Sequence, residues 1–333
     1  MDLCRWVGDG MKTELIIGNK RTGKMWEVSN STTTVSYTTE RTGSPGKLTF
    51  TVIKSGDLDF VEGDIVRWSV DGQLIFYGWV FTKSKDRWGI IDVTCYDRIR
   101  YLKATQPYAF YNQTATEIIQ QIAADLQLDV SSVADTGYAL PSYISSGSGT
   151  CLDIIQEVLD QTLLNTGTIY VLYDDGNGIA LQSPQNMVSD VVIGDKSLLT
   201  DYTYKTDIDS QTYNSVKLAR PNEETGKADT VVAEDSANIG QWGLLQLYQE
   251  VDGAVNTAQM TAQAQATLSF YNRRLRTLKV SSLGVLGLRA GNMVRMKVDG
   301  LGDIDLNQLV LLEKVTHTWE QNVHTMEFET MEI

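Results

Sequence analysis

Two histidines near the C-terminal end have the clearest potential for chemistry. His317 and His324 flank the turn Glu320-Gln321-Asn322, so the two rings can face each other across a hairpin with a carboxylate nearby. A zinc site needs three or four ligands with a supporting shell, but the whole sequence contains only 2 histidines. We therefore expect no metal, and a structural pair whose ring nitrogens bond to neighbouring backbone.

The cysteines are the candidate nucleophiles. A Cys/His peptidase needs a thiol beside a histidine and a third group that orients the histidine. Cys151 is the better candidate because it is expected in the first turn of a helix, which lowers a thiol pKa, whereas Cys95 is expected within a strand. No family signature surrounds either residue. Together with Cys4 they make an odd number without CxxC spacing, so we expect reduced structural thiols and no catalytic residue.

Two glycine-containing segments and one aromatic run match binding motifs only in part. The run Asp174-Asp175-Gly176-Asn177-Gly178 lacks the ligand spacing and final Glu of an EF-hand, so we expect a hairpin turn. Residues 147–150 (GSGT) precede a helix and could cradle phosphate, but no Lys follows as in a P-loop. The aromatic run could be a sugar-binding platform, although such residues are more often barrel core and subunit contacts. It consists of Trp68, Phe76, Tyr77 and Trp79.

The first hundred residues, which must position several of these side chains, have the pattern of strands. Segments rich in Thr, Val, Ile and aromatics alternate, as in Leu48, Phe50 and Val52. Asp71-Gly72 supplies the positive φ of a two-residue hairpin turn. We predict an antiparallel sheet curled into a barrel. The predicted strands span residues 32–39, 47–54, 65–70, 73–80 and 89–96.

From about residue 105 the hydrophobic residues recur at the spacing of an α-helix. Thr114 with Glu117 three residues later forms a capping box, and a second helix begins at Thr150 with Asp153 three residues on. We expect a loop over residues 137–149. A hairpin is predicted from strands at 168–173 and 179–182.

The C-terminal third returns to strands around one long helix. The helix is predicted from about 257 to 274, and Ala258, Ala262, Ala266 and Tyr271 mark its expected packing face. The predicted strands span residues 215–218, 230–233, 244–250, 277–282, 293–298, 308–317 and 323–330.

The predicted fold class is therefore β-rich α+β, with two tube-protein-like β-barrel domains flanking a small α+β domain. We expect the first barrel over residues 1–104, an acidic α+β insertion over 105–199, and the second barrel with the long helix over 200–333.

The net charge of −14 is concentrated in the middle of the chain. Residues 105–199 hold 1 Lys/Arg against 11 Asp/Glu, whereas residues 1–104 hold 15 against 13 and residues 200–333 hold 12 against 18. An acidic surface repels duplex phosphate, so we expect no sequence-specific nucleic-acid binding. The same sign would suit a channel wall past which DNA slides, and it would equally serve solubility alone.

The two β-rich ends share a short internal repeat. Residues 62–72 match residues 290–300 at six of eleven positions without a gap. The alternative to a true repeat is a chance similarity, because glycine turns followed by alternating strands are common in hairpins. The next strand pair also lines up after a gap of seven residues. Its aligned pairs are Val80 with Val315, Ile91 with Met326 and Val93 with Phe328.

A true repeat would give the chain two copies of one barrel-like unit. Three chains would then present six copies in a ring, threefold by chain and nearly sixfold by shape. Such a ring could join a hexameric tube to a trimeric spike.

Several separate segments also carry a family resemblance. They are residues 43–52 (GSPGKLTFTV), 62–79 from EGD to FYGW, 94–103 (TCYDRIRYLK), 235–243 (DSANIGQWG), 315–319 (VTHTW) and 322–326 (NVHTM). In these segments, and over nearly its whole length, the chain resembles the XkdQ/YqbQ-like tail proteins of Gram-positive phages and defective prophages. The resemblance implies membership of the wider late-control-D-like baseplate hub superfamily of contractile phage tails and phage-tail-like particles.

What the resemblance implies is a structural role without catalytic residues or cofactors. In that superfamily a homotrimer carries two tube-like barrels per chain, stands on the tail spike protein and caps the distal end of the tail tube. The expected partners are the spike, the tube or tube-initiator protein, the tape-measure protein and other baseplate proteins. The expected location is the tail baseplate of a virion or phage-tail-like particle.

Synthesis in the host bacterial cytoplasm is expected, because the first five residues lack the basic and then apolar layout of a signal peptide. We also expect no membrane insertion, because runs such as 309–312 are far shorter than a bilayer requires. Two other function classes stay open. One is a baseplate-associated peptidoglycan hydrolase, and the other is a cell-wall carbohydrate-binding module.

Overall fold

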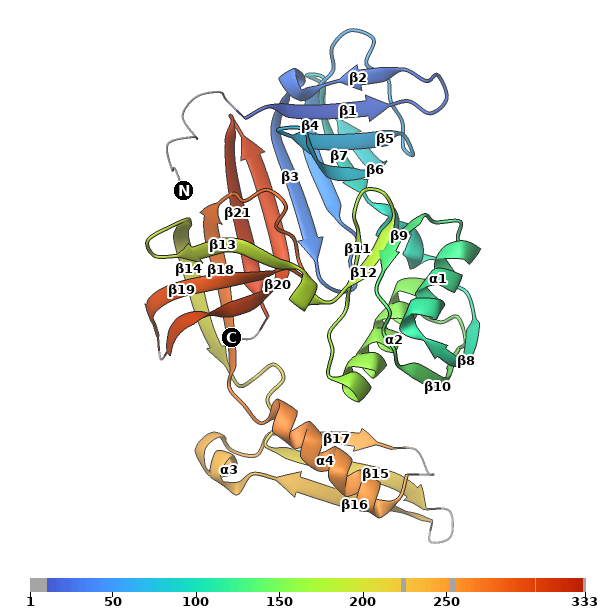
Figure 1. Cartoon of the computed structure of the whole chain (residues 1–333), viewed down its shortest axis with the longest axis vertical. Helices are drawn as coiled ribbons and strands as arrows, with labels where there is room; N and C mark the ends of the chain where they lie inside the picture. Colours follow the sequence, from blue (N-terminus) through green and yellow to red (C-terminus); the bar gives the residue numbers. More distant parts are fainter. Residues whose placement is uncertain (1–10, 223–225, 252–254, 303, 332–333) are drawn as a thin grey trace. The chain divides into compact units, whose positions relative to one another are not determined.

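The computed structural model in Figure 1 describes residues 11–222, 226–251, 255–302 and 304–331. The chain divides into two compact units. Unit 1 contains the described residues of Met1–Thr203 and Lys279–Met331, and unit 2 contains those of Tyr204–Leu278. The domain boundaries predicted after residues 104 and 199 both lie inside unit 1, and the division into three domains stays a prediction.

A 13-stranded sheet forms most of unit 1. Its neighbours run in the order β14-β18-β21-β20-β3-β4-β7-β6-β5-β1-β2, and β19 pairs with both β13 and β20. The five strands predicted in the first hundred residues are all present. The strands of this sheet are β1 (Thr13–Gly18), β2 (Met25–Glu27), β3 (Thr32–Glu40), β4 (Lys47–Ile53), β5 (Ile65–Val70), β6 (Gln73–Lys85), β7 (Ile90–Tyr96), β13 (Val188–Gly194), β14 (Leu199–Asp207), β18 (Leu275–Leu283), β19 (Met293–Leu301), β20 (Ile304–Glu320) and β21 (Val323–Thr330).

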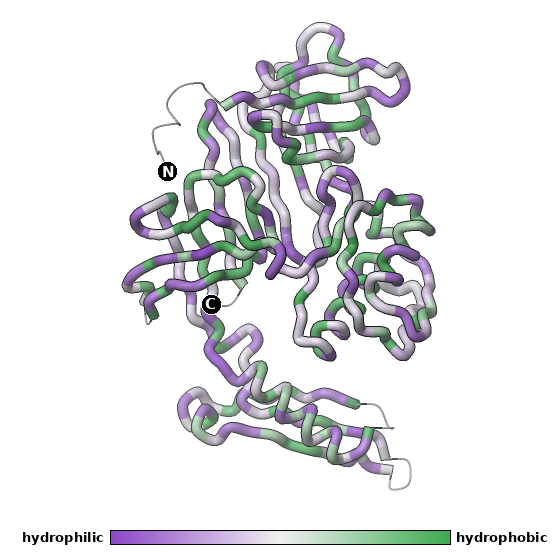
Figure 2. Tube along the Cα trace, in the orientation of Figure 1, coloured by the Kyte–Doolittle hydropathy of each residue, from purple (hydrophilic) through white to green (hydrophobic). Residues whose placement is uncertain are grey.

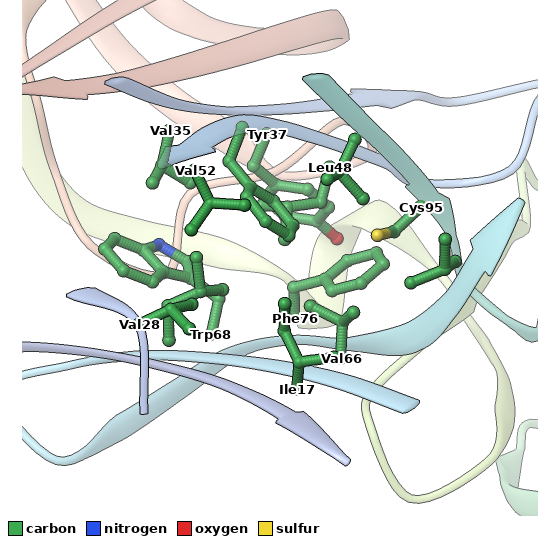
Figure 3. Packing of buried hydrophobic residues seen from close by; sticks show 14 of the residues in the cluster. Ile17, Val28, Val35, Tyr37, Leu48, Val52, Val66, Trp68, Phe76 and Cys95 are labelled. Atoms are coloured by element: carbon green, nitrogen blue, oxygen red, sulfur yellow. The ribbon is translucent and has the colours of Figure 1, made fainter. Parts of the chain in front are cut away.

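Strict alternation along the strands produces the first core of unit 1. Leu48, Phe50 and Val52 of β4 are buried, while the residues between them are not. Figure 2 shows the same change between hydrophobic and hydrophilic residues along these strands. Their side chains meet those of facing strands in Figure 3, where the rings of Tyr37 and Phe76 lie 5.6 Å apart, edge to face.

The turn between β5 and β6 has the predicted conformation. Asp71 and Gly72 have φ of 49° and 79°, so both central residues are left-handed, as a tight hairpin requires. The hairpin register follows from this turn, because Val70 pairs with Gln73 across it.

β20 joins the two ends of the chain into one sheet. Its last residues lie between two strands: β21 on one edge and β3 on the other. Along β3 the pairs run from Lys314 with Glu40 to Glu320 with Thr34. We call this contact the β3–β20 seam. Each of its strands lies some 280 residues from the other, yet they share a backbone ladder and the Thr38–Thr316 hydroxyl contact at 3.0 Å.

Strands β5-β6-β7 and β19-β20-β21 repeat the same local structure. Gly63 N–H donates to the carbonyl of Val80, and Gly291 N–H donates to that of Leu312, at 2.7 and 2.8 Å. Both glycines have positive φ, 87° and 92°. A β-bulge follows directly after Val80 and directly after Leu312. Equivalent turns, hydrogen bonds and bulges mark the internal repeat in three dimensions.

The predicted alignment of that repeat was wrong in one place. Val80 corresponds to Leu312 rather than to Val315, because the carbonyls of Val80 and Leu312 accept the equivalent glycine N–H. The second copy of the repeat is seven residues longer than the first. The sequence alignment placed all seven extra residues before the partner of Val80, whereas the structure places four of them before that partner and three after it. After the bulge, the pairing of β20 with β21 agrees with the residue matches predicted from the sequence. These are Ile91 with Met326 and Val93 with Phe328.

Two capped helices and two small sheets make up the rest of unit 1. The hydroxyls of Thr114 and Thr150 each accept from the backbone N–H three residues on, and their own backbone N–H groups donate to the carboxylates of Glu117 and Asp153, so both predicted capping boxes are confirmed. The helices bury Ile118, Ile122 and Val158 in a second core. The elements are α1 (Ala115–Asp125), α2 (Cys151–Thr166), the pair β8 (Tyr108–Thr114) and β10 (Ala139–Ser145), and the sheet β11 (Val171–Asp174), β12 (Ile179–Gln182) and β9 (Val130–Val133).

The loop predicted over residues 137–149 is wrong in its middle part. Residues 139–145 form β10, which pairs with β8 from Ala139 to Ser145. Leu140 is buried in the second core, but Pro141 and Ser142 beside it are exposed. A two-stranded ribbon with few apolar residues has little sequence signal, because its partner strand and the helices behind it supply the stabilisation.

Unit 2 is a three-stranded sheet with a helix packed on it. Strand order is β16-β15-β17, and α4 covers one side of the sheet. The predicted long helix is confirmed, ending at Tyr271. The elements are β15 (Ser215–Asn222), β16 (Lys227–Glu234), α3 (Ser236–Trp242), β17 (Gln246–Glu250) and α4 (Thr257–Tyr271).

The predicted packing face of α4 is wrong. Met260 and Ala264 are fully buried against Val216 and Leu218 of β15, with Leu268 packed beside them. The predicted alanines at 258, 262 and 266 are exposed. Apolar residues occur on every side of this helix, so the larger Met and Leu side chains decide which stripe faces the sheet.

Within the described ranges, no helix combines the length and apolar character needed to cross a membrane.

Candidate functional site

The two histidines lie together at the β3–β20 seam. His317 Nδ1 is 2.9 Å from His324 Nε2, and His317 Nε2 is 2.7 Å from the carbonyl oxygen of Leu288. Because a carbonyl only accepts, neutral His317 carries its proton on Nε2, and its Nδ1 accepts the proton of His324. The prediction of a structural pair with a backbone partner is confirmed. Both nitrogens of His317 are occupied, which leaves no lone pair for a metal or for proton transfer.

Aromatic packing and burial hold both rings neutral. Trp319 stacks on His317 and on His324, with centroids 5.5 and 4.6 Å apart. Burial lowers the pKa of His317 to about 4. Burial and the neighbouring His317 lower the pKa of His324 to about 3. Gly284 backs the second ring, since a Cβ there would lie 2.2 Å from it.

Metal ligands do not gather around the pair. Glu320 is exposed at the end of β20. Throughout the part of the chain that the structure describes, no group of three or more His, Cys, Asp or Glu is placed to hold a metal ion. The absence of a metal remains a prediction for metal analysis to test.

A buried charged cluster that the sequence analysis missed lies beside the seam. Arg98 Nη1 donates to both carboxylate oxygens of Asp174 at 3.0 and 3.1 Å, and the backbone carbonyl of Asp174 accepts from Arg289 Nη1 at 2.8 Å. Arg98 follows β7, Asp174 ends β11, and Arg289 precedes β19. The cluster therefore ties three distant segments of unit 1 together. A cavity of about 180 Å³ opens between it and His317.

Asp97 adds an acid to this cluster. Its carboxylate accepts from the backbone N–H groups of Gly46 and Ile99 at 2.9 and 3.1 Å. Burial and the nearby charge of Asp174 raise the pKa of Asp97 to about 8. Gly46 has no room for a side chain, because a Cβ would lie 2.4 Å from Asp97 Oδ2. The family segment at residues 94–103 was the one sequence signal that included Asp97 and Arg98.

The run from Asp174 to Gly178 is the predicted hairpin turn between β11 and β12. Asp175 Oδ1 accepts from the N–H groups of Asn177 and Gly178 at 2.8 and 2.9 Å. Asp174 accepts from Gly176 N–H and from Arg98. The carboxylates are thus bonded to the turn itself and to an arginine, which leaves a calcium ion no open ligand set.

The two described cysteines are buried and free. Cys95 lies inside β7, and burial raises the pKa of its thiol. Cys151 is the first residue of α2, as predicted, but burial raises its pKa rather than the helix start lowering it. A raised pKa favours the neutral thiol over the nucleophilic thiolate at both cysteines. Cys4 lies outside the described residues.

The glycine segment before α2 is closed by a carboxylate. Asp153 accepts from the N–H and the hydroxyl of Thr150 at 2.8 and 2.7 Å. This bond lowers the pKa of Asp153 and fixes a negative charge at the helix start. A phosphate would have to displace that charge, so the segment acts as a helix cap.

The aromatic run divides between two faces of the sheet. Trp68 and Phe76 are core residues, as predicted. Tyr77 and Trp79 lie on the other face, where Arg98 sits 5.2 and 5.7 Å from their ring centres. We call this outer set the aromatic ladder. It continues through Phe81, Tyr96 and Tyr101 by ring contacts of 5.2 to 5.9 Å.

Comparisons with known proteins agree on one family. The family described as YqbQ-like matches residues 35–331. The uncharacterized protein YqbQ of Bacillus subtilis is 29% identical over 308 residues, covering 90% of this chain and 92% of YqbQ. The phage-like element PBSX protein XkdQ of the same organism is 28% identical over 304 residues, covering 90% and 91%.

A solved structure shares the fold. It is the 43 kDa tail protein of prophage MuSo2 from Shewanella oneidensis, with a TM-score of 0.70 at 14% identity. The match covers 96% of this chain and 98% of that protein. At this identity, the similarity establishes a common architecture over the full length of both chains.

Proposed function

Because the chain belongs to the YqbQ-like family, we propose that it is the central hub of a contractile tail baseplate. In this role it is a homotrimer that joins the hexameric tail tube to the trimeric spike. Two facts about similar proteins support the proposal: XkdQ belongs to a phage-like element, and the protein from prophage MuSo2 is a tail protein. The role is structural and needs no catalytic residue.

The internal repeat is the observation that carries the proposal. Equivalent glycine turns and bulges recur in β5-β6-β7 and β19-β20-β21. Two such units per chain give a trimer six similar units, which is the count that a hexameric tube presents. A chain with a single unit would leave a threefold ring facing a sixfold one.

The proposed domains follow the same logic. Residues 1–104 form one tube-like barrel, residues 200–333 contribute the second, and residues 105–199 form an α+β insertion. The insertion has 1 basic residue against 11 acidic ones. An acidic lining would let DNA pass through a central channel without binding.

The proposed partners are the spike, the tail tube or its initiator, the tape-measure protein and other baseplate proteins. The corresponding location is the baseplate of a phage or a headless bacteriocin-like particle. The buried state of both described cysteines and of His317 supports the structural role over that of a peptidoglycan hydrolase.

A carbohydrate-binding module is the second candidate, and the aromatic ladder favours it. A cavity of about 470 Å³ beside the ladder is lined by Trp79, Tyr101 and Asp129, among others. Rings with a nearby carboxylate are typical of sugar sites. Calorimetric titration with host wall polysaccharide tests it, and the hub proposal expects no binding heat.

Assembly state is the decisive test of the hub. We expect light scattering after size exclusion to give three times the mass of one chain, and electron microscopy to show a ring of six similar lobes around a channel. A monomer at every concentration, with or without the tube and spike proteins, would refute the proposal.

A further inference from the structure

The β3–β20 seam is a template for a second contact of the same kind. Around it, the repeat extends to five strands: β3-β4-β7-β6-β5 occur in the same order as β14-β18-β21-β20-β19. β14 and β18 run antiparallel like β3 and β4, since Leu283 N–H donates to the carbonyl of Leu198. In this correspondence, β14 is the counterpart of β3, and β6 is the counterpart of β20.

Only one of the two equivalent contacts is made within the chain. β3 of the first repeat pairs with β20 of the second. The counterpart contact would join β14 to the end of β6, but β14 ends the sheet order, and among the described residues no strand pairs with its outer edge. β5 covers β6 only from Gln73 to Trp79.

Beyond that point, no strand in the described part of the chain pairs with this edge of β6. Asp86 N–H donates to Ile90 on the β7 side, so alternate residues, Lys83 and Lys85, direct their backbone groups to the opposite edge. In β20 the corresponding alternate residues direct their backbone groups to the β3 side of the seam. Glu313 is one of them, since its carbonyl accepts from Arg41 N–H at 2.8 Å. Residues 82–88 are exposed, whereas their counterparts in β20 include the buried Val315, His317 and Trp319.

We propose that β14 of one chain adds to the edge of β6 in a second copy of this chain, repeating the β3–β20 seam between subunits. The contact is antiparallel and joins residues 199–203 to residues 83–87. It is heterologous, since each chain offers both edges, so it propagates around a ring until the ring closes. The inference rests on the proposed trimeric hub and specifies the strands that assemble it.

Charge and exposure agree with this partner. Lys83, Lys85 and Arg87 occupy alternate positions and therefore one face of the β6 end. Asp201 on β14 is exposed and can supply a carboxylate to the cations on that face. Exposed, unpaired edges of this length invite pairing with another chain, and a partner strand satisfies their backbone groups.

Cross-linking between differently tagged chains tests the contact. One chain carries Trp88→Cys and the other Asp201→Cys, both with Cys4→Ser so that the remaining thiols are the buried Cys95 and Cys151. A short bismaleimide is added to the assembled mixture. We expect a covalent species that contains both tags, and none from either chain alone.

A matched control places the cysteine at Met25, on the far edge of the same sheet and 63% exposed. Met25→Cys mixed with Asp201→Cys should give no product. A trimer that yields no mixed product, or the same yield with Met25→Cys, would overturn the β14–β6 contact while leaving the hub intact. A monomer that yields no product would refute both.

Charge reversal gives a second measurement on residues that are exposed and outside the core. K85E/R87E should weaken trimer formation about tenfold, and adding D201K should restore much of it. Unchanged assembly in K85E/R87E would count against the contact. The fold of each variant is checked by circular dichroism.

Discussion

Acidification should destabilise unit 1 through the buried His317. Its folded pKa of about 4 lies below the ordinary value of 6.5. The unfolded chain therefore binds a proton between these pH values that the folded chain excludes. The contribution of the neutral ring to stability is complete above pH 6.5 and is lost as the pH falls toward 4.

The size of this effect follows from the two pKa values. Between pH 8 and pH 5, the free energy of unfolding should fall by about 2 kcal/mol on account of His317 alone. His324 adds to it in the same direction, since its pKa is lowered to about 3. Asp97 opposes it, because a raised pKa of about 8 makes its contribution complete below pH 4 and lost as the pH rises to 8.

His317→Gln separates these contributions. Its amide can still donate to the Leu288 carbonyl, but it does not titrate. We expect the difference in free energy of unfolding, wild type minus variant, to fall by about 2 kcal/mol between pH 8 and pH 5, because Asp97 and the other groups contribute equally to both proteins. The control is His324→Gln, in which His317 keeps its backbone bond and most of its own pH dependence.

Imidazole NMR gives a direct readout, because the chain contains only 2 histidines. Both rings should stay neutral at pH 5.5, with His317 protonated on Nε2. A ring that titrates with a midpoint near 6.5, or equal pH dependence in wild type and His317→Gln, would refute the reasoning about burial.

Three further substitutions test the packing. Arg98→Met should cost about 3–5 kcal/mol, because it leaves the Asp174 carboxylate buried without its cation, and R98M/D174L should recover part of this in urea titrations. Met260→Ala should destabilise unit 2 by about 2–5 kcal/mol, whereas the exposed Ala262→Ser should change its thermal midpoint very little; equal effects would contradict the observed face of α4. Gly284→Ala should cost about 1–3 kcal/mol and shift the His324 NMR signals, and an unshifted spectrum would mean that the ring is not held there.

Local structure was readable from the sequence wherever neighbouring residues decide it. The alternation of Leu48, Phe50 and Val52, the Asp71-Gly72 turn and the caps at Thr114 and Thr150 all formed as predicted. Each depends on residues within a few positions of one another. The histidine pair was predictable for the same reason, since a tight turn places the two rings on facing strands.

Contacts between distant segments were not readable in this way. The stripe of α4 that faces β15 depends on which side chains fill the space over the sheet, and the α4 sequence offers several. The cluster of Arg98, Asp174 and Arg289 forms where three segments of the chain come together. The spacing of these residues in the sequence does not predict the contact. β10 could not be predicted as a strand without knowing that it pairs with β8.

The histidines illustrate the difference between what the sequence determines and what the tertiary structure determines. The sequence by itself determined that the chain has two of them, that they flank a turn, and that they are too few for a zinc site. Only the tertiary structure decided their chemistry. The Leu288 carbonyl sets the tautomer of His317, and the β3–β20 seam buries the ring beside Trp319. Ionisation depends on the solvent that a ring has lost, and packing of strands hundreds of residues apart removes that solvent.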